Sequence, residues 1–242
     1  MLYYNATLRL RMFHADFSLD VNRIRDLLRL GLPAATQILF ELAAFTGAAV
    51  LAGKIGAIPL AAHQIALNCA AASYMVPLGI SSATAVRTGN AWGRGKPGEA
   101  HRAGHAGIVL GCGFMACCAI VFLAIPKPLA RIFSPDPAVV QAGASLLLIA
   151  AAFQLFDGLQ IVMTGALRGI GNTRLPMLAN LFGYWAFGLP VGWWLGLRLG
   201  MGVFGIWIGL CVGLIAVALV LFAAWEMRFR TAESKRSISV SN

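Results

Sequence analysis

The sequence predicts an all-α polytopic membrane protein with six transmembrane helices and both termini in the cytoplasm. Three observations lead to this fold class: 59% of the 242 residues are hydrophobic, 12% are charged, and the apolar residues form long continuous runs. Soluble domains carry about 25% charged residues, so the composition is that of a membrane protein. A transmembrane β-barrel would instead need alternating apolar and polar residues.

A spanning helix needs about 20 apolar residues, and six segments meet this need: residues 29–53, 59–86, 105–125, 137–165, 175–196 and 202–225. Turn-forming or charged stretches separate them, including a basic loop at 87–104, PKP and SPDP around the third connection, and RGIGNTR before the fifth segment. Proline and glycine of this kind end or begin helices. We therefore expect a transmembrane lobe over 28–226, between a cytoplasmic linker at 1–27 and a cytoplasmic tail at 227–242.

The basic residues predict how the helices are oriented. A net charge of +10 would suggest nucleic-acid binding in a soluble protein, but these residues cluster at helix ends and are not interleaved with aromatics. With a cytoplasmic N-terminus, most Lys and Arg fall inside, and the four outside are Lys54, Lys127, Arg131 and Arg198. Positive charge favours the cytoplasmic side, so we expect both termini there and no nucleic-acid partner.

Glycines repeat every four residues in the last two segments. The two series are Gly188, Gly192, Gly196 and Gly200, and Gly205, Gly209 and Gly213. Small residues at this spacing let helix backbones approach closely in a membrane. We interpret them as packing surfaces.

Two of the nine acidic residues, Glu41 and Asp157, lie inside apolar segments, whereas the others lie in tails, loops or helix ends. A charged carboxylate facing lipid at mid-membrane costs about 2.5–3.5 kcal/mol or more. Both side chains are therefore expected to face an interior cavity.

Polar neighbours at helical spacing support such a cavity. Gln37 precedes Glu41 by one turn, and Gln154, Gln160 and Thr164 share a face with Asp157. Two further segments contribute polar groups: His63, Gln64 and Asn68 in the second, and Asn180 and Tyr184 in the fifth. Four helices that turn polar groups inward predict a hydrated cavity.

Two carboxylates beside one cavity favour cation coupling. Poor solvation and mutual repulsion oppose two negative charges there, so at least one acid would hold a proton, which a monovalent cation could replace. Exchange of the two could bias a two-state helix arrangement. The alternative is that each acid merely locks helices together by hydrogen bonds. His63 is a weaker candidate, for proton relay or simple helix contact.

Known enzyme motifs are absent from the sequence. It has no Gly-x-Ser-Gly, HExxH or Gly-x-Gly-Asp, and no GxxxxGK[ST] loop for a nucleotide. We expect no enzyme activity and no cofactor, with an ion gradient as the energy source.

Several motifs in order resemble the bacterial NorM-type branch of the multidrug and toxic compound extrusion (MATE) transporters. They are LLRLGLPAATQILFELAAF, AAHQIALN, FQLFDGLQIVMTGALRGIGNTRLPM and YWAFGLPVGWWLG followed by GIWIGL. The resemblance runs from about residue 17 to 225 and implies the carboxy-terminal six-helix lobe of a twelve-helix protein. Met1 would then fall where the linker between the lobes lies.

The resemblance implies export of cationic drugs in exchange for Na⁺ or H⁺ across the bacterial inner membrane. In sodium-coupled members the carboxylates that match Glu41 and Asp157 are implicated in cation binding, so Na⁺ is the candidate metal ion. The resemblance also marks Phe153, where some sodium-coupled relatives carry a tyrosine hydroxyl that this chain lacks. The second lobe would be a separate chain or another copy.

Two alternatives remain open at this point. One is an inactive, truncated half-transporter with a structural or regulatory role. The other is a flippase for a lipid-linked precursor, although its pyrophosphate would call for a cationic cavity and the intramembrane charges here are acidic.

Overall fold

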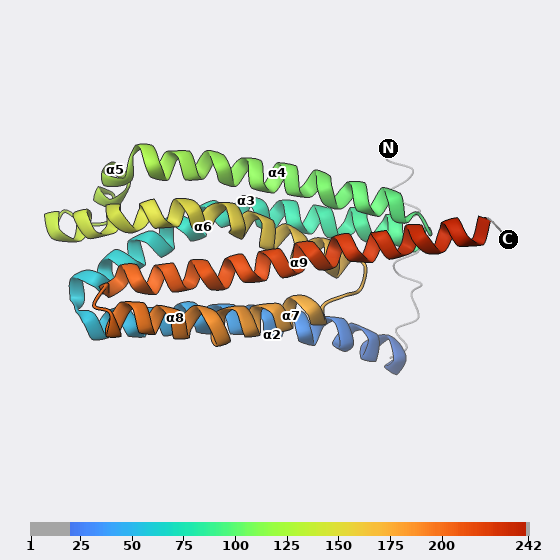
Figure 1. The fold of residues 1–242 in the computed structure, drawn as a ribbon, viewed down its shortest axis with the longest axis horizontal. Helices are drawn as coiled ribbons and strands as arrows, with labels where there is room; N and C mark the ends of the chain where they lie inside the picture. Colours follow the sequence, from blue (N-terminus) through green and yellow to red (C-terminus); the bar gives the residue numbers. More distant parts are fainter. Residues whose placement is uncertain (1–19, 241–242) are drawn as a thin grey trace, which may run out of the picture.

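The computed structural model describes residues 20–240, with side chains described as far as residue 230. This part of the chain is helical and contains no strand. Its long helices lie side by side along one axis (Figure 1). They are α2 (Val21–Ile55), α3 (Ala57–Gly93), α4 (Pro97–Ala124), α6 (Pro137–Gly169) and α9 (Gly202–Val240), and a short α5 (Pro126–Arg131) precedes α6.

Five helices, α2, α3, α4, α6 and part of α9, are long and apolar enough to cross a membrane. The segment expected to form another span, 175–196, is a continuous helical stretch assembled from short pieces: α7 (Arg174–Asn180), the π-helical η1 (Leu181–Gly188), α8 (Leu189–Trp193) and η2 (Trp194–Arg198). Pro190 lies in the first turn of α8, and proline lacks the N–H that an uninterrupted α-helix would use. The π geometry was not predicted.

The basic loop expected at 87–104 is wrong, because α3 continues to Gly93 and α4 begins at Pro97. Gly95 has a φ of +69°, which favours glycine in the short turn between them. The Arg94 and Lys96 side chains form ion pairs with Glu99 at 3.3 and 2.9 Å. Polar sequence therefore does not mark the ends of these helices.

The first and last described helices, α2 and α9, also extend past their predicted limits. Asp20 caps α2, its Oδ1 accepting from the Asn22 and Arg23 amides at 3.0 and 3.3 Å, so the helix begins inside the expected linker. The rest of that linker, 1–19, lies outside the described residues. At the other end, α9 continues through the expected tail to Val240.

The interior of the bundle is built around α6. Over half of its most apolar window, 56%, is buried, compared with 17% for α2. The buried residues of α2 lie along one face, formed by Gln37, Ala44, Ala48 and Ala52. Large apolar side chains such as Leu39 and Val50 are exposed on the same helix, as expected for a surface that meets lipid or another protein.

Close packing joins the 174–198 stretch to α9. A Cβ atom added to Gly209 would collide with the backbone of Gly188 and Gly192, and one added to Gly205 would collide with Gly196. The predicted packing role of these glycines is confirmed. Gly200 differs, since its φ is +72° and a Cβ there would meet nothing within 4 Å. It belongs to the turn before α9.

Basic side chains lie mainly at one end of the bundle. The α3–α4 turn, the α6–α7 connection and the end of α9 share that end (Figure 1), which carries Arg87, Arg94, Lys96, Arg168, Arg174, Arg228 and Arg230. Lys54, Lys127, Arg131 and Arg198 belong to the connections at the opposite end.

Candidate functional site

A largely apolar cavity of about 450 Å³ lies between α2, α3, α6 and α9. Polar groups enter it from three of these helices: Glu41 from α2, Asn68 and Tyr74 from α3, and Asp157 from α6. The remaining lining is mostly apolar and includes Leu42, Phe45, Met75, Leu78, Phe153 and Trp207. No Lys, Arg or His from the described part of the chain lines it.

The structure brings Glu41 and Asp157 to this one cavity, although they are 116 positions apart in the sequence. Glu41 is half-buried and lies near the buried Ala44 on the inner side of α2. Asp157 is 5% exposed, and the two carboxylates interact electrostatically. The structure thus brings two acids from different helices together in one largely apolar cavity.

A hydrogen-bonded chain connects this acid pair to the 174–198 stretch. The Gln160 side chain contacts the Glu41 carboxyl group. Its Nε2 also donates to Asn180 Oδ1 at 2.9 Å, and its Oε1 accepts from the Tyr184 hydroxyl at 3.4 Å. Gln160, Asn180 and Tyr184 are all buried, so Asn180 and Tyr184 fix the orientation of the Gln160 amide that contacts Glu41.

A second contact joins the same stretch to α2. The Trp185 indole N–H donates to the Phe40 carbonyl oxygen at 3.1 Å, next to Glu41 in the sequence. The position of this part of α2 is thus linked directly to η1.

Aromatic rings form one wall of the cavity. Phe153 packs against Phe45 and Trp207, with ring centroids 6.1 and 5.9 Å apart, and Phe45 packs against Tyr184 at 5.8 Å. Aromatic faces attract cations, most strongly where water is excluded. Phe153 therefore supplies an aromatic ring to this wall but no hydroxyl group, which a tyrosine at this position would have.

The other predicted site residues lie at different depths. Asn68 lines the cavity, but its amide donates to the backbone of Gln64, and Gln64 itself is exposed. Gln154 is buried and donates to Ser73 Oγ. The remaining two, Gln37 and Thr164, are buried outside the cavity lining.

His63 lies behind the aromatic wall and does not line the cavity. Its Nδ1 accepts from the Trp207 indole N–H at 3.2 Å, whereas its Nε2 has no hydrogen-bond partner in the described part of the chain. A fully buried ring in this position supports the packing of Trp207.

Sequence reasoning missed Tyr74 and Trp207 as lining residues. Leu67, Ala71, Tyr74 and Leu78 follow one another at helical spacing, and this pattern marks one face of α3. It could have identified Tyr74 once Asn68 was suspected. Trp207 lies in an apolar run in which nothing distinguishes an indole at a cavity from one in the core.

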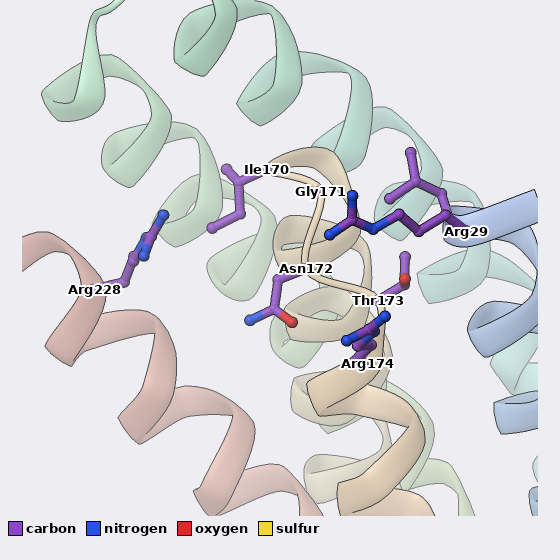
Figure 2. Close-up of a pocket in the computed structure, with 8 residues that line it drawn as sticks. Arg29, Ile170, Gly171, Asn172, Thr173, Arg174 and Arg228 are labelled. Carbon is purple, nitrogen blue, oxygen red and sulfur yellow. The ribbon is translucent and has the colours of Figure 1, made fainter. Parts of the chain in front are cut away.

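A second hollow, of about 280 Å³, lies at the basic end of the bundle. Figure 2 shows Arg29 of α2 and Arg228 of α9 on opposite sides of the α6–α7 connection, with Arg174 at the start of α7. Asn172 and Thr173 of the connection complete its polar lining. No carboxylate of the described residues lines this hollow, so its charge is opposite to that of the cavity that holds Glu41 and Asp157.

Comparison with known proteins matches the MatE family model to residues 33–194. The chain is 42% identical over 223 residues to a probable multidrug resistance protein NorM of Brucella suis, covering 90% of this chain and 47% of that protein. A protein of the same name from Mesorhizobium japonicum is 44% identical over 229 residues, covering 93% and 49%. This chain thus spans about half the length of these curated relatives.

Solved structures share the fold. A crystal structure of the eukaryotic MATE transporter AtDTX14 superimposes with a TM-score of 0.80 at 24% identity, over 96% of this chain and 56% of that one. A MATE structure in the bent conformation gives 0.84 at 20% identity, over 92% and 49%. In length and fold the chain corresponds to about half of such a molecule.

Proposed function

Because the chain belongs to the MatE family, we propose that it forms one six-helix lobe of a secondary antiporter. This antiporter exports cationic drugs and other toxic organic compounds in exchange for Na⁺ or H⁺. The lobe would be the carboxy-terminal one. Transport would need a second six-helix lobe, on a separate chain or in a second copy.

The observation that carries this proposal is the pair of acids in an apolar cavity. Glu41 and Asp157 share that cavity, and no basic side chain of the described residues lines it. Uncompensated charge is poorly solvated in such surroundings. A proton or monovalent cation that enters the cavity would neutralise one of the two charges.

The contacts around the pair suggest how ion binding would change the shape of the lobe. A cation held by Glu41 and Asp157 would draw α2 towards α6. Gln160 would transmit the change to Asn180 and Tyr184 in the 174–198 stretch. The ion would thereby favour one of two helix arrangements in proportion to its differential affinity for them.

An organic cation would compete for the same negative charge. The rings of Phe45, Phe153 and Trp207 offer it apolar and cation–π contacts that Na⁺ uses less well. Exclusion of the coupling ion by the drug, and of the drug by the ion, is the basis of exchange in one cavity.

The proposed arrangement in the membrane uses the 174–198 stretch as the sixth span. Twenty-odd residues at about 1.5 Å each suffice to cross a hydrocarbon layer of about 30 Å. The end that carries Arg87, Arg168 and Arg228 would face the cytoplasm of a bacterial inner membrane, in accordance with the bias of basic residues. Both termini would then be cytoplasmic.

Dye efflux tests the proposal. The chain would be produced alone, and together with the amino-terminal half of a NorM relative, in cells that lack their own efflux pumps. We expect cation-dependent export of a fluorescent organic cation from the pair and its loss in Asp157→Asn. Glu99→Gln, an acid at the exposed start of α4, is the matched control.

The same experiment separates the alternatives. Efflux from the lone chain would indicate assembly with a second copy. If neither the lone chain nor the pair exports dye, and purified protein binds neither Na⁺ nor the dye, the inactive structural role is the correct one.

A further inference from the structure

A cluster of three ligating side chains lies at the basic end of the bundle, outside the cavity that holds the acid pair. His101 and His105 come from α4, and Glu226 comes from α9. The two His Nε2 atoms are 3.0 Å apart, and Glu226 Oε1 lies 3.3 and 2.9 Å from those of His101 and His105. Three potential ligand atoms therefore point at one place.

Hydrogen bonds alone fit this triangle poorly. Each imidazole nitrogen carries or lacks one hydrogen, which can point along one side of the triangle only. If both rings donate to the carboxylate, the two N–H groups face each other. A central cation instead uses all three lone pairs at once.

The dimensions suit a tetrahedral transition-metal ion. Zn–N and Zn–O bonds of about 2.0–2.1 Å place tetrahedral ligands about 3.3 Å apart, and the three separations here are 2.9–3.3 Å. The His pair has i, i+4 spacing on one helix, which presents both rings on one face. Two imidazoles favour Zn²⁺ or its neighbours over Na⁺, Mg²⁺ or Ca²⁺.

Neighbouring aromatic rings hold His101 in place. Its ring lies 4.9 Å from that of Phe229 and is stacked on Trp225 at 6.4 Å between centroids. Gly104 allows this packing, because a Cβ there would collide with the Trp225 ring. The ligand side chains remain reachable, with 29%, 42% and 23% of His101, His105 and Glu226 exposed.

We propose that His101, His105 and Glu226 bind one divalent transition-metal ion of the Zn²⁺ type, with the fourth position open to water. The ion would join α4 to α9, two helices that have few contacts with each other. Each packs mainly against other helices, among them α6. This proposal does not depend on the transport function, since the cluster shares no residue with the cavity.

Metal titration of the purified full chain in detergent tests this proposal. After EDTA treatment and its removal, Zn²⁺ binding is followed by calorimetry, and Co²⁺ binding by its visible absorption. We expect one ion per chain. His105→Gln and Glu226→Gln should each weaken binding by more than about tenfold, the loss caused even by removal of outer-shell partners.

Three further variants make the result decisive. Glu99→Gln, on the same end of α4, and Asp157→Asn, in the cavity, should bind Zn²⁺ like the unmodified chain. His105→Cys keeps a ligand atom and should restore Co²⁺ binding with thiolate-to-metal absorption, which shows that a loss in His105→Gln is not misfolding. The proposal is overturned if the unmodified chain shows no saturable binding, or if His105→Gln and Glu226→Gln bind as well as it does.

Discussion

The cavity that holds Glu41 and Asp157 and the cluster of His101, His105 and Glu226 place similar groups in opposite surroundings. In both, a carboxylate on one helix meets ligating groups on another. The cavity offers two oxygen ligands within apolar walls, whereas the cluster offers two imidazoles and one carboxylate at a polar helix end. Donor chemistry and depth together decide which ion each place suits. Under the two proposals, the first would bind an exchanging monovalent ion and the second a retained transition metal.

The largest expected effect is that of Asp157→Asn, which should impair transport and leave metal binding at the cluster intact. Asp157→Asn removes one of the two charges in the cavity and should abolish cation-dependent dye efflux from the two-lobe assembly, a fall of at least about tenfold. Zn²⁺ affinity at the cluster should stay unchanged. Dye-efflux assays and Zn²⁺ titrations of the same variant test these two expectations. Loss of Zn²⁺ binding in this variant would show that the two places are coupled and break the comparison.

A packing change should affect the cavity strongly and the cluster weakly. Gly209→Val places a branched side chain against the backbone of Gly188 and Gly192. Overpacking of this kind costs about 1–3 kcal/mol or more, and it would shift the stretch that carries Asn180 and Tyr184. We expect a lower melting temperature and weaker Na⁺ or dye binding. Gly113→Val, where a Cβ would meet nothing within 4 Å, is the matched control.

A milder change tests the polar frame of Glu41. Gln160→Leu removes the partner of Glu41, Asn180 and Tyr184 and leaves buried polar groups unpaired, at about 1–3 kcal/mol each. Cation affinity should fall about tenfold if about 1.4 kcal/mol of this is lost from the bound state. Gln64→Leu, at an exposed position, should leave cation affinity unchanged in the same calorimetric measurement. Equal cation affinities in Gln160→Leu and Gln64→Leu would show that Gln160 does not contribute to cation binding.

The smallest effect concerns the ring behind His101. Trp225→Phe keeps an aromatic neighbour but removes a buried indole N–H that has no hydrogen-bond partner in the described part of the chain. Burial of such a group is unfavourable, so the metal-free protein should be as stable as before or slightly more so. Zn²⁺ affinity should fall by about threefold at most, because phenylalanine keeps a ring beside His101 and the Trp225 N–H gives no hydrogen bond to a ligand. A loss as large as that of Glu226→Gln would make Trp225 part of the site.

The sequence predicted that Glu41 and Asp157 face an interior cavity, because acids inside apolar runs are rare and expensive. The expectation of a hydrated cavity was wrong, because most of the polar neighbours do not line it and its walls are largely apolar. Glu41 and Asp157 could be selected on that ground alone, before anything was known of their positions. The chain of Gln160, Asn180 and Tyr184 was predicted only as separate polar residues, because their pairing depends on how α6 and the 174–198 stretch face each other. Helical spacing gives the face of a residue but not its partner.

The cluster could not be found in the same way. His101 lay in the expected loop at 87–104 and Glu226 at the expected end of the last helix, where charged residues are common. Only the continuation of α4 and α9 as helices brings them together. The π-helical stretch escaped prediction for a related reason, since π turns carry no distinct residue pattern. Contacts between distant segments had to come from the structure.

The unequal burial of α2 and α6 has a mechanical consequence for the acid pair. Asp157 belongs to α6, a helix whose most apolar window is 56% buried, and Glu41 belongs to α2, whose window is 17% buried and whose inner face is mainly alanine. Alanine side chains make fewer contacts than larger ones, so under the proposed function we expect α2, rather than α6, to move when an ion binds. A positive ion bound between the two carboxylates would then hold the less enclosed helix, α2, against the more enclosed one, α6.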